Sequence, residues 1–393
     1  MLSSKTKGKM RMFTYLSGFF LSMNVALPSY FNAQFINQFL DETKVGIIFA
    51  ISSVLGIFFI SLMPKVARRV GILRTTTWMA VLKVAIVLFL ISSHSGFWSL
   101  FFFVLYYAVN YTFFYNMDLY LESLSDDAKT GKIRGIYLTV VNLAWLCSPF
   151  LAGYLLRSQA GFDGLYLLTA VVLLPLIYLT VFKLKETPAG NIKKTNVFHA
   201  LRQVLAKKDQ LTKNVFHILL VDFLLNFFYT IMIVYMGLYL INEKHFSVLA
   251  ISVIFTIMLI PFVVLDYPMG KIADRYGEKK SLLLSLLFMA ATTMVISFIT
   301  SQALWVWALA LMATRVGASI MEIMKETYLF KQIDEQDASV LCISRNLAPV
   351  AYIIGPIVGC VFLTVFDLRY IFLFLGLVVL TGIYPILKLR DTK

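Results

Sequence analysis

The sequence predicts an all-α polytopic membrane protein, with twelve transmembrane helices in two pseudo-symmetric six-helix bundles. Of its 393 residues, 60% are hydrophobic and only 14% are charged, and the mean hydropathy is +0.81. A soluble domain has about 25% charged residues, so this chain has too few charges to cover a surface that faces water. The spacing of the apolar stretches and a repeated loop sequence point the same way.

The apolar stretches are about 20 residues long, which is the length that crosses a hydrocarbon core of ~30 Å. The expected spans are 12–37, 44–63, 72–92, 97–121, 134–156, 164–183, 214–241, 247–268, 281–300, 303–329, 338–364 and 370–388. Only Thr300-Ser301-Gln302 separates the ninth span from the tenth, which predicts a tight hairpin. The first apolar run ends without a small-residue cleavage site, so we expect a retained helix and not a signal peptide.

Lysine and arginine residues set the orientation of the chain. With an inside amino terminus, the intracellular segments hold 27 of them, the outer segments hold 4, and 4 lie within spans. Because cytoplasmic loops are rich in these residues, both termini are expected on the cytoplasmic side of the plasma (inner) membrane. The net charge of +14 then reflects basic loops beside anionic lipid headgroups and not nucleic-acid binding.

The longest polar stretch lies in the middle of the chain, from Lys183 to Lys213. It predicts an amino-terminal six-helix bundle (1–183), a cytoplasmic linker (184–213) and a carboxyl-terminal six-helix bundle (214–393).

Two sequence echoes indicate that the bundles are copies of one unit. Lys65 to Gly71 reads KVARRVG, and 206 residues later Lys271 to Gly277 reads KIADRYG. The second echo has an offset of 204: Asp118, Glu122 and Asn142-Leu143-Ala144 recur as Glu322, Glu326 and Asn346-Leu347-Ala348.

The second loop, from Gly270 to Lys280, resembles the G-x-x-x-D-R-x-G-x-K signature of the major facilitator superfamily, at the place where that family has it. Gly270 and Gly277 would permit a tight turn. Asp274 would cap a helix or meet a cation, and Arg275 would hold the loop at the cytoplasmic surface. The resemblance covers essentially the whole chain. It implies two bundles that enclose a central cavity and rock to open it alternately to either side of the membrane.

The first loop departs from that signature, with Pro64 in place of glycine and Arg68 in place of aspartate. In the family, each such loop docks near a helix of the other half. We therefore expect a charge exchange, in which Arg68 or Arg69 faces acids at the entry to span eleven and Asp274 faces bases at the entry to span five. These acids are Asp334, Glu335 and Asp337, and the bases are Lys132 and Arg134. The alternative is a set of basic loops with no specific partners.

Spans five and eleven each carry a proline beside small residues, at 148–153 (SPFLAG) and 355–359 (GPIVG). They are similar to weak copies of the family's G-P-x-x-G-G element, which is associated with antiporters. The alternative is ordinary close helix packing with a proline bend, and the serine in the first copy weakens the antiporter interpretation.

Ionisable residues inside a span are costly, so each is a candidate functional residue. Asp118 and Glu122 share one face of span four, and Glu322 and Glu326 repeat that spacing on span ten. A carboxylate in a medium of low dielectric constant tends to take up a proton, and contact with water reverses this. That cycle is the elementary step of proton-driven transport. Alternatively, Glu122 and Glu326 lie at the headgroups and Glu322 pairs with Lys325 one turn away.

Three further charges lie in predicted spans. Arg315, mid-span in span ten and seven residues from Glu322, is expected to face the cavity and to bind an anionic substrate or a carboxylate. Asp222 in span seven reads as an isolated acid with Asn226 one turn on, either a proton or substrate site or an interfacial residue. Lys83 in span three is expected to pair with an acid of span four.

Amides and aromatic rings accompany these charges and could line a cavity for a small polar or amphipathic molecule, or simply bond neighbouring helices. They are Asn24, Asn32, Gln34, Asn110, Tyr111, Tyr115, Asn116, Asn142, Trp145, Asn226 and Tyr229, and Pro28 accompanies them in span one.

Nothing in the sequence indicates soluble-type chemistry. There is no phosphate-binding glycine loop followed by lysine, no nucleophile with a recognisable partner, and no cofactor site. The four histidines lack metal-ligand spacing, and Cys147, Cys342 and Cys360 lie in apolar stretches without a disulfide framework.

The sequence therefore predicts a secondary active transporter that moves a small-molecule substrate as a monomer in the lipid bilayer, coupled to protons. Asp118, Glu322 and Asp222 are the leading acids and Arg315 is the candidate anion contact. Uptake and efflux both remain open. The alternatives are a non-transporting membrane sensor or scaffold of the same fold and, with less support, a membrane-embedded enzyme.

Overall fold

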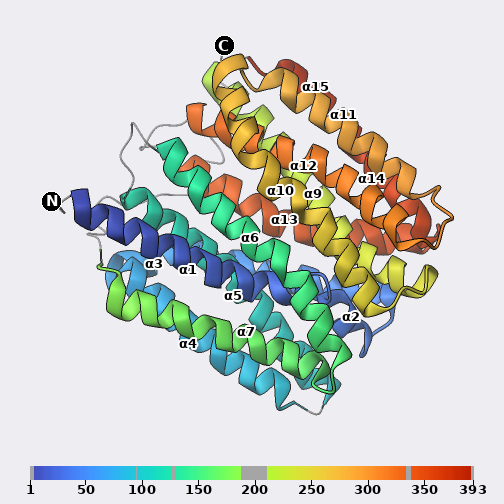
Figure 1. The fold of residues 1–393 in the computed structure, drawn as a ribbon, viewed down its shortest axis with the longest axis horizontal. Coiled ribbons are helices and arrows are strands. Elements are labelled where there is room, and N and C mark those ends of the chain that lie inside the picture. The colour runs from blue at the N-terminus through green and yellow to red at the C-terminus, as the bar shows by residue number, and fades with distance from the viewer. Residues whose placement is uncertain (1–3, 94, 125–129, 187–209, 333–337, 391–393) are drawn as a thin grey trace. The chain divides into compact units, whose positions relative to one another are not determined.

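The computed structural model describes residues 4–93, 95–124, 130–186, 210–332 and 338–390, and every regular element in these ranges is a helix (Figure 1). The first half contains α1 (Ser4–Ser29), α2 (Asn32–Asn37), α3 (Glu42–Val70), α4 (Ile72–Ile91), α5 (Gly96–Ser123), α6 (Thr130–Arg157), α7 (Gly161–Tyr178) and the π-helix η2 (Leu179–Lys183). The second half contains α9 (Gln210–Leu238), the π-helix η4 (Tyr239–Glu243), α10 (Val248–Tyr276), α11 (Lys279–Ile296), α12 (Leu304–Gln332), α13 (Ala338–Leu363), the 3-10 helix η6 (Leu368–Tyr370), α14 (Ile371–Leu380) and α15 (Ile383–Lys388).

Within the described residues, 11 helical segments are long and apolar enough to cross a membrane, and they coincide with the second to twelfth predicted spans. The first predicted span corresponds to α1 and α2. Helix α1 is less apolar because it carries polar side chains that are buried within the protein, namely Thr14, Ser17, Ser22 and Asn24. These side chains face neighbouring helices and do not need an aqueous surface.

The helices form two compact units, which are described separately. Unit 1 comprises residues 1–41 and 47–193, and unit 2 comprises residues 42–46 and 194–393. In unit 1, α1 packs on α6 and α7, and α4 packs on α5 and α7. In unit 2, α9 packs on α13, α10 packs on α12, and α11 packs on α12 and α14. Three packing pairs recur at equivalent places in the chain: α1–α6 with α9–α13, α4–α5 with α11–α12, and α4–α7 with α11–α14.

The two repeated loops are mostly helical, which differs from the boundaries predicted by hydropathy. Helices α3 and α10 continue past the predicted ends of their spans, at 63 and 268, to Val70 and Tyr276. Each helix stops at a glycine in the left-handed region, Gly71 with φ 106° and Gly277 with φ 80°. Such backbone angles disfavour any residue with a side chain. The tight turn is therefore made at Gly277, whereas Gly270 lies inside α10.

A carboxylate caps the amino terminus of α4. Glu186, just after η2, accepts hydrogen bonds from the backbone N–H groups of Leu73 (3.0 Å) and Arg74 (3.3 Å). The first N–H groups of a helix have no partner within the helix and carry partial positive charge, so a carboxylate there stabilises the helix end. The bond also ties the end of the last helical segment of unit 1 to the start of α4.

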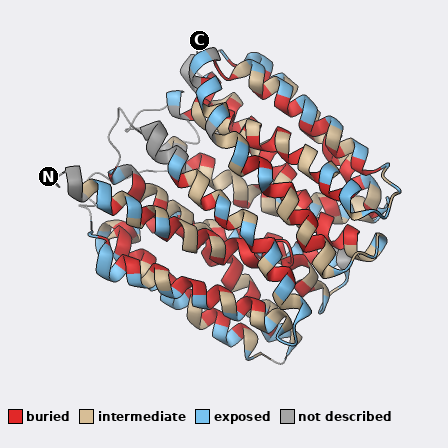
Figure 2. Ribbon diagram, viewed as in Figure 1, coloured by how far each residue is buried: buried red, intermediate tan, exposed pale blue. Residues whose placement is uncertain are grey.

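Many large apolar side chains of both units are exposed. The buried residues lie on the faces where helices meet (Figure 2). Several of the apolar side chains are between 65% and 71% exposed: Trp78, Phe97, Tyr154, Phe182, Leu284 and Trp305. An apolar surface of this extent is unfavourable in water. Such a surface is compatible with the lipid chains of a bilayer.

Helices α11 and α12 approach each other closely at Gly317. A methyl group added to Gly317 would lie 2.8 Å from the backbone nitrogen of Met289 and 2.8 Å from the backbone oxygen of Ser285. Gly317→Ala should therefore destabilise unit 2 by ~1–3 kcal/mol, the usual cost of overpacking, measured as a lower unfolding temperature in detergent.

Gly270→Ala is the matched control, because Gly270 is also helical and a methyl group there meets nothing within 4 Å. It should leave stability unchanged or raise it by up to ~1 kcal/mol, since alanine favours the helix. Equal unfolding temperatures for the two variants would contradict the close packing.

Candidate functional site

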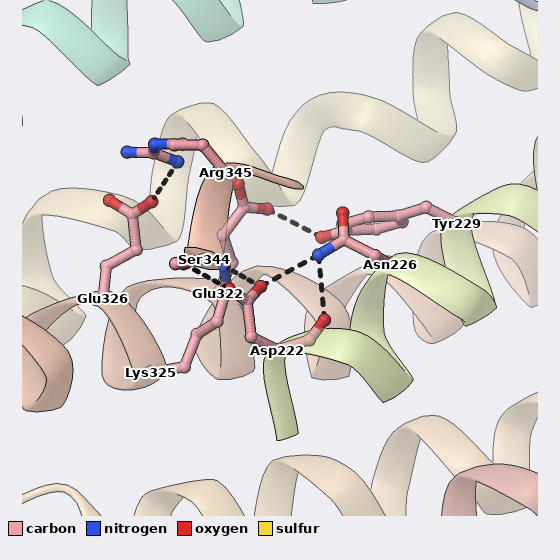
Figure 3. Close-up of polar contacts among 8 residues, drawn as sticks. All are labelled: Asp222, Asn226, Tyr229, Glu322, Lys325, Glu326, Ser344 and Arg345. Atoms are coloured by element: carbon pink, nitrogen blue, oxygen red, sulfur yellow. Dashed lines mark hydrogen bonds and ion pairs between the residues drawn. The ribbon is translucent and has the colours of Figure 1, made fainter. Parts of the chain in front are cut away.

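The candidate site lies in unit 2, where polar side chains of α9, α12 and α13 meet (Figure 3). We call the eight residues drawn in Figure 3 the charged network: Asp222, Asn226, Tyr229, Glu322, Lys325, Glu326, Ser344 and Arg345. The members from α9 are spaced by four and three residues, and those from α12 by three and one. Each set therefore projects from one face of its helix. Four of the predicted site residues, Asp222, Asn226, Glu322 and Glu326, are brought together here.

Asp222 is the centre of the charged network and is 3% exposed. Its Oδ1 accepts hydrogen bonds from Lys325 Nζ at 2.5 Å and from Asn226 Nδ2 at 2.9 Å. Its Oδ2 accepts a hydrogen bond from Ser344 Oγ at 2.6 Å. The expectation that Asp222 is an isolated acid is therefore wrong, because donors from α9, α12 and α13 surround its carboxylate.

Lys325 does not pair with Glu322, its neighbour on α12, but with Asp222 across the helix interface. The Glu322 carboxylate instead points to α9 and accepts a hydrogen bond from Tyr229 Oη at 2.7 Å (Figure 3). Glu326 pairs with Arg345, with 3.1 Å between Oε1 and Nη1. Within the described part of the chain, Asp222 and Glu326 thus each form a direct ion pair. Glu322 instead accepts a hydrogen bond from a neutral hydroxyl, and Lys325 attracts it electrostatically without a direct ion pair.

A small cavity adjoins the charged network. It is lined by Ile218, Leu329 and five members of the network, Asp222, Lys325, Glu326, Ser344 and Arg345. The cavity has a volume of about 10 Å³, which is room for about one water molecule. Its polar lining would give such a molecule several hydrogen-bond partners.

Arg315 lies on α12 two turns before Glu322 and is 1% exposed. Its guanidinium carbon is 5.0 Å from the ring centre of Phe228 and 5.4 Å from that of Tyr229. Its Nε and Nη1 atoms are buried and find no hydrogen-bond partner among the described residues. Tyr229 therefore contacts Arg315 through its ring and Glu322 through its hydroxyl group.

The other predicted residues are not part of this network. Asp118 and Asn142 are half-buried on α5 and α6 of unit 1. Arg68 is half-buried near the end of α3, and Arg275 is exposed near the end of α10. The side chains of Glu122, Asp274 and Arg134, and the acids at 334, 335 and 337, lie outside the described residues. The charge exchange between the loops therefore stays a prediction.

Lys83 has different partners from the acid that we expected. It is fully buried on α4, and its Nζ donates hydrogen bonds to the side-chain oxygens of Asn24 and Asn110. Among the described residues, no carboxylate pairs with it. The expectation failed because two amides on neighbouring helices supply the acceptors that a carboxylate was assumed to supply.

Sequence reasoning gave no role to Ser344 or Arg345 and treated Tyr229 only as a possible cavity-lining residue. The available signal was a charged residue beside a serine in an otherwise apolar stretch of span eleven. Among the described residues, no three His, Cys, Asp or Glu side chains gather into a group that could hold a metal ion.

Comparison with known proteins identifies the family. The sequence model of the Major Facilitator Superfamily matches residues 11–320 and, again, residues 218–393. The multidrug resistance protein MdtG of Salmonella heidelberg (strain SL476) is 22% identical over 355 residues, which are 88% of this chain and 85% of MdtG.

Solved transporters have the same fold. The xylose transporter XylE from E. coli, in a partially occluded inward-open conformation, aligns with a TM-score of 0.74 at 14% identity, covering 99% of both chains. The human organic anion transporter MFSD10 (TETRAN) aligns with a TM-score of 0.73 at 13% identity, covering 97% of this chain and 99% of its own. The nucleoside transporter NupG aligns with a TM-score of 0.73 at 12% identity and the same coverage. Together with the matched family model, the helical fold and the apolar outer surface, these likenesses lead to one conclusion: the chain belongs to the major facilitator superfamily and is an integral membrane transporter, not an enzyme.

Proposed function

We propose that this transporter is a proton-coupled secondary active transporter, which moves a small solute carrying an anionic group. Transport would proceed by alternating access between the bundles 1–183 and 214–393, joined by the cytoplasmic linker 184–213. The recurrence of the same helix packing pairs in both units supports such a duplicated design. The excess of lysine and arginine in alternate loops supports cytoplasmic termini.

Glu322 is the proposed proton carrier, and its hydrogen bond to Tyr229 is the observation that carries this assignment. A carboxylate that binds a cation, such as Asp222 with Lys325, would leave a buried charge unpaired if it took up a proton. Protonation of Glu322 breaks no ion pair among the described residues. It would remove the electrostatic attraction of Lys325 and would require the tyrosine hydroxyl group and the carboxyl group to rearrange one hydrogen bond.

Arg315 is the proposed contact for the anionic group of the solute. A buried guanidinium is costly unless its N–H groups are bonded, and the two aromatic rings beside it return only ~0.5–2 kcal/mol. A carboxylate or phosphate oxygen would satisfy Nε and Nη1 together in the bidentate geometry that arginine favours. Since Tyr229 contacts both Arg315 and Glu322, an anion at Arg315 would change the surroundings of the proposed proton carrier.

Proton coupling is tested by reconstitution in liposomes and by measuring the flux of metabolites and drugs with and without a pH gradient. The native protein should show a flux that the gradient raises several-fold. Glu322→Gln should keep exchange without a gradient but lose the stimulation, because an amide cannot take up the proton. Asp118→Asn tests the acid of unit 1 in the same assay.

Two comparison variants separate coupling from folding. Asp163→Asn, at an exposed position on α7, should respond to the gradient as the native protein does. Asp222→Asn should instead lose stability by ~3–5 kcal/mol, because it leaves Lys325 as an unpaired buried charge. A native flux that ignores the gradient, or a Glu322→Gln variant that is still stimulated, would disprove the assignment.

The anion contact is tested with Arg315→Met, which removes the charge and keeps much of the apolar volume. It should raise the KM for anionic solutes by about tenfold or more, which corresponds to ~1.4 kcal/mol of binding free energy, with little change in unfolding temperature. Arg345→Met is the matched control. It removes the guanidinium that pairs with Glu326, so it should destabilise the protein. An unchanged KM in Arg315→Met would rule out an anion contact at this residue.

A further inference from the structure

The interior of unit 1 holds a buried amine at the meeting point of four helices. Lys83 of α4 is fully buried, and its Nζ donates to Asn24 Oδ1 on α1 and to Asn110 Oδ1 on α5. The Nζ atom also lies 4.5 Å from the ring centre of Tyr106 and 5.6 Å from that of Phe113, both on α5. A hydrogen bond from Asn24 extends the cluster to α7.

Both hydrogen-bond partners of this nitrogen are acceptors, and both nearby aromatic rings attract a cation. The two amide oxygens have lone pairs, and the faces of the two aromatic rings carry negative partial charge. The orientation of the Asn24 amide is fixed independently, because its Nδ2 donates to the backbone oxygen of Thr169 at 2.7 Å. With the NH₂ group bound there, the oxygen of Asn24 must face Lys83.

These surroundings suit an ammonium group. An ammonium has three N–H donors and no lone pair, so two amide oxygens and the aromatic faces can satisfy it. A neutral amine could also donate to both amide oxygens, but its lone pair would find no donor among these four groups. Two oxygens with two ring faces also suit an N–H cation better than a metal ion, which prefers a full shell of oxygen ligands.

We propose that unit 1 contains a binding site for one alkylammonium cation, formed by Asn24, Asn110, Tyr106 and Phe113, and that the side chain of Lys83 occupies it as a tethered ligand. The site joins α1, α4, α5 and α7 through one positive charge that the chain itself supplies. Unit 1 consequently carries a fixed cation at its centre without taking Na⁺ or K⁺ from solution. The proposal does not depend on proton coupling in unit 2.

Removing the tether and returning the cation tests the site. In Lys83→Ala, the missing atoms correspond to n-propylammonium, which can reach a membrane interior as the neutral amine. The unfolding temperature in detergent should fall by about 5 °C or more, and millimolar n-propylamine should restore at least half of the loss. The neutral analogue 1-propanol should restore little. Equal recovery with 1-propanol, or no recovery with the amine, overturns the proposal.

Two further variants make the test specific. Lys83→Met fills the tether volume without a charge, so it should be destabilised and should gain nothing from the amine. In Lys83→Ala with Asn24→Leu, one acceptor is lost, and recovery with n-propylamine should fall at least several-fold. Full recovery in this double variant would place the amine elsewhere and overturn the site.

The charge of Nζ can also be read in the native chain. All lysines are labelled with ¹⁵Nζ, and the resonance of Lys83 is the one that is missing from the spectrum of the Lys83→Arg variant. That resonance reports the charge of Nζ at neutral pH. An ammonium resonance supports the site, and an amine resonance overturns it.

Discussion

Charges inside apolar helices must find their partners within the chain, because the bilayer offers none. The two units meet this constraint with different chemistry. In unit 2, carboxylates and cations pair across α9, α12 and α13, with Asp222 bound by donors from all three helices. In unit 1, a single lysine is held by amide oxygens and aromatic rings. These groups join α9, α12 and α13 in unit 2, and α1, α4 and α5 in unit 1.

The buried charges differ in how completely their hydrogen bonds and ion pairs are formed, and the roles proposed for them follow this difference. Asp222 and Glu326 each bind a cation, so their carboxylates contribute chiefly to the joining of helices. Glu322 has one neutral donor, and Arg315 has two nitrogens without a hydrogen bond among the described residues. A buried group whose bonding is incomplete is expensive to maintain. Such a group is where a proton or a solute has the most to add.

Much of the fold follows from the sequence, because hydropathy reflects the thickness of the bilayer and is a local property. The helix ends were less predictable. Helices α3 and α10 stop at glycines with positive φ, several residues beyond the apolar stretch, since helical hydrogen bonding does not require apolar side chains.

The partners of the charges could not be predicted from spacing. Lys325 is one turn from Glu322 on α12, yet it pairs with Asp222, which lies 103 positions away. The choice depends on which helices pack together, and on the Tyr229 hydroxyl group that already binds Glu322. Lys83 likewise binds two amides whose positions are set by α1 and α5. The residue types and their places in the spans identified Asp222, Glu322 and Arg315 as candidate site residues. Only the tertiary packing shows which side chains they contact.

The position of Tyr229 separates two kinds of interaction within one side chain. Its ring lies beside the Arg315 guanidinium, while its phenolic oxygen reaches Glu322. Phenylalanine differs from tyrosine by that oxygen alone. Exchange of the two residues would leave the aromatic neighbour of the arginine in place and detach the acid. Under the proposed function, a change of this one residue to phenylalanine would alter how strongly solute and acid influence each other, with neither ion replaced.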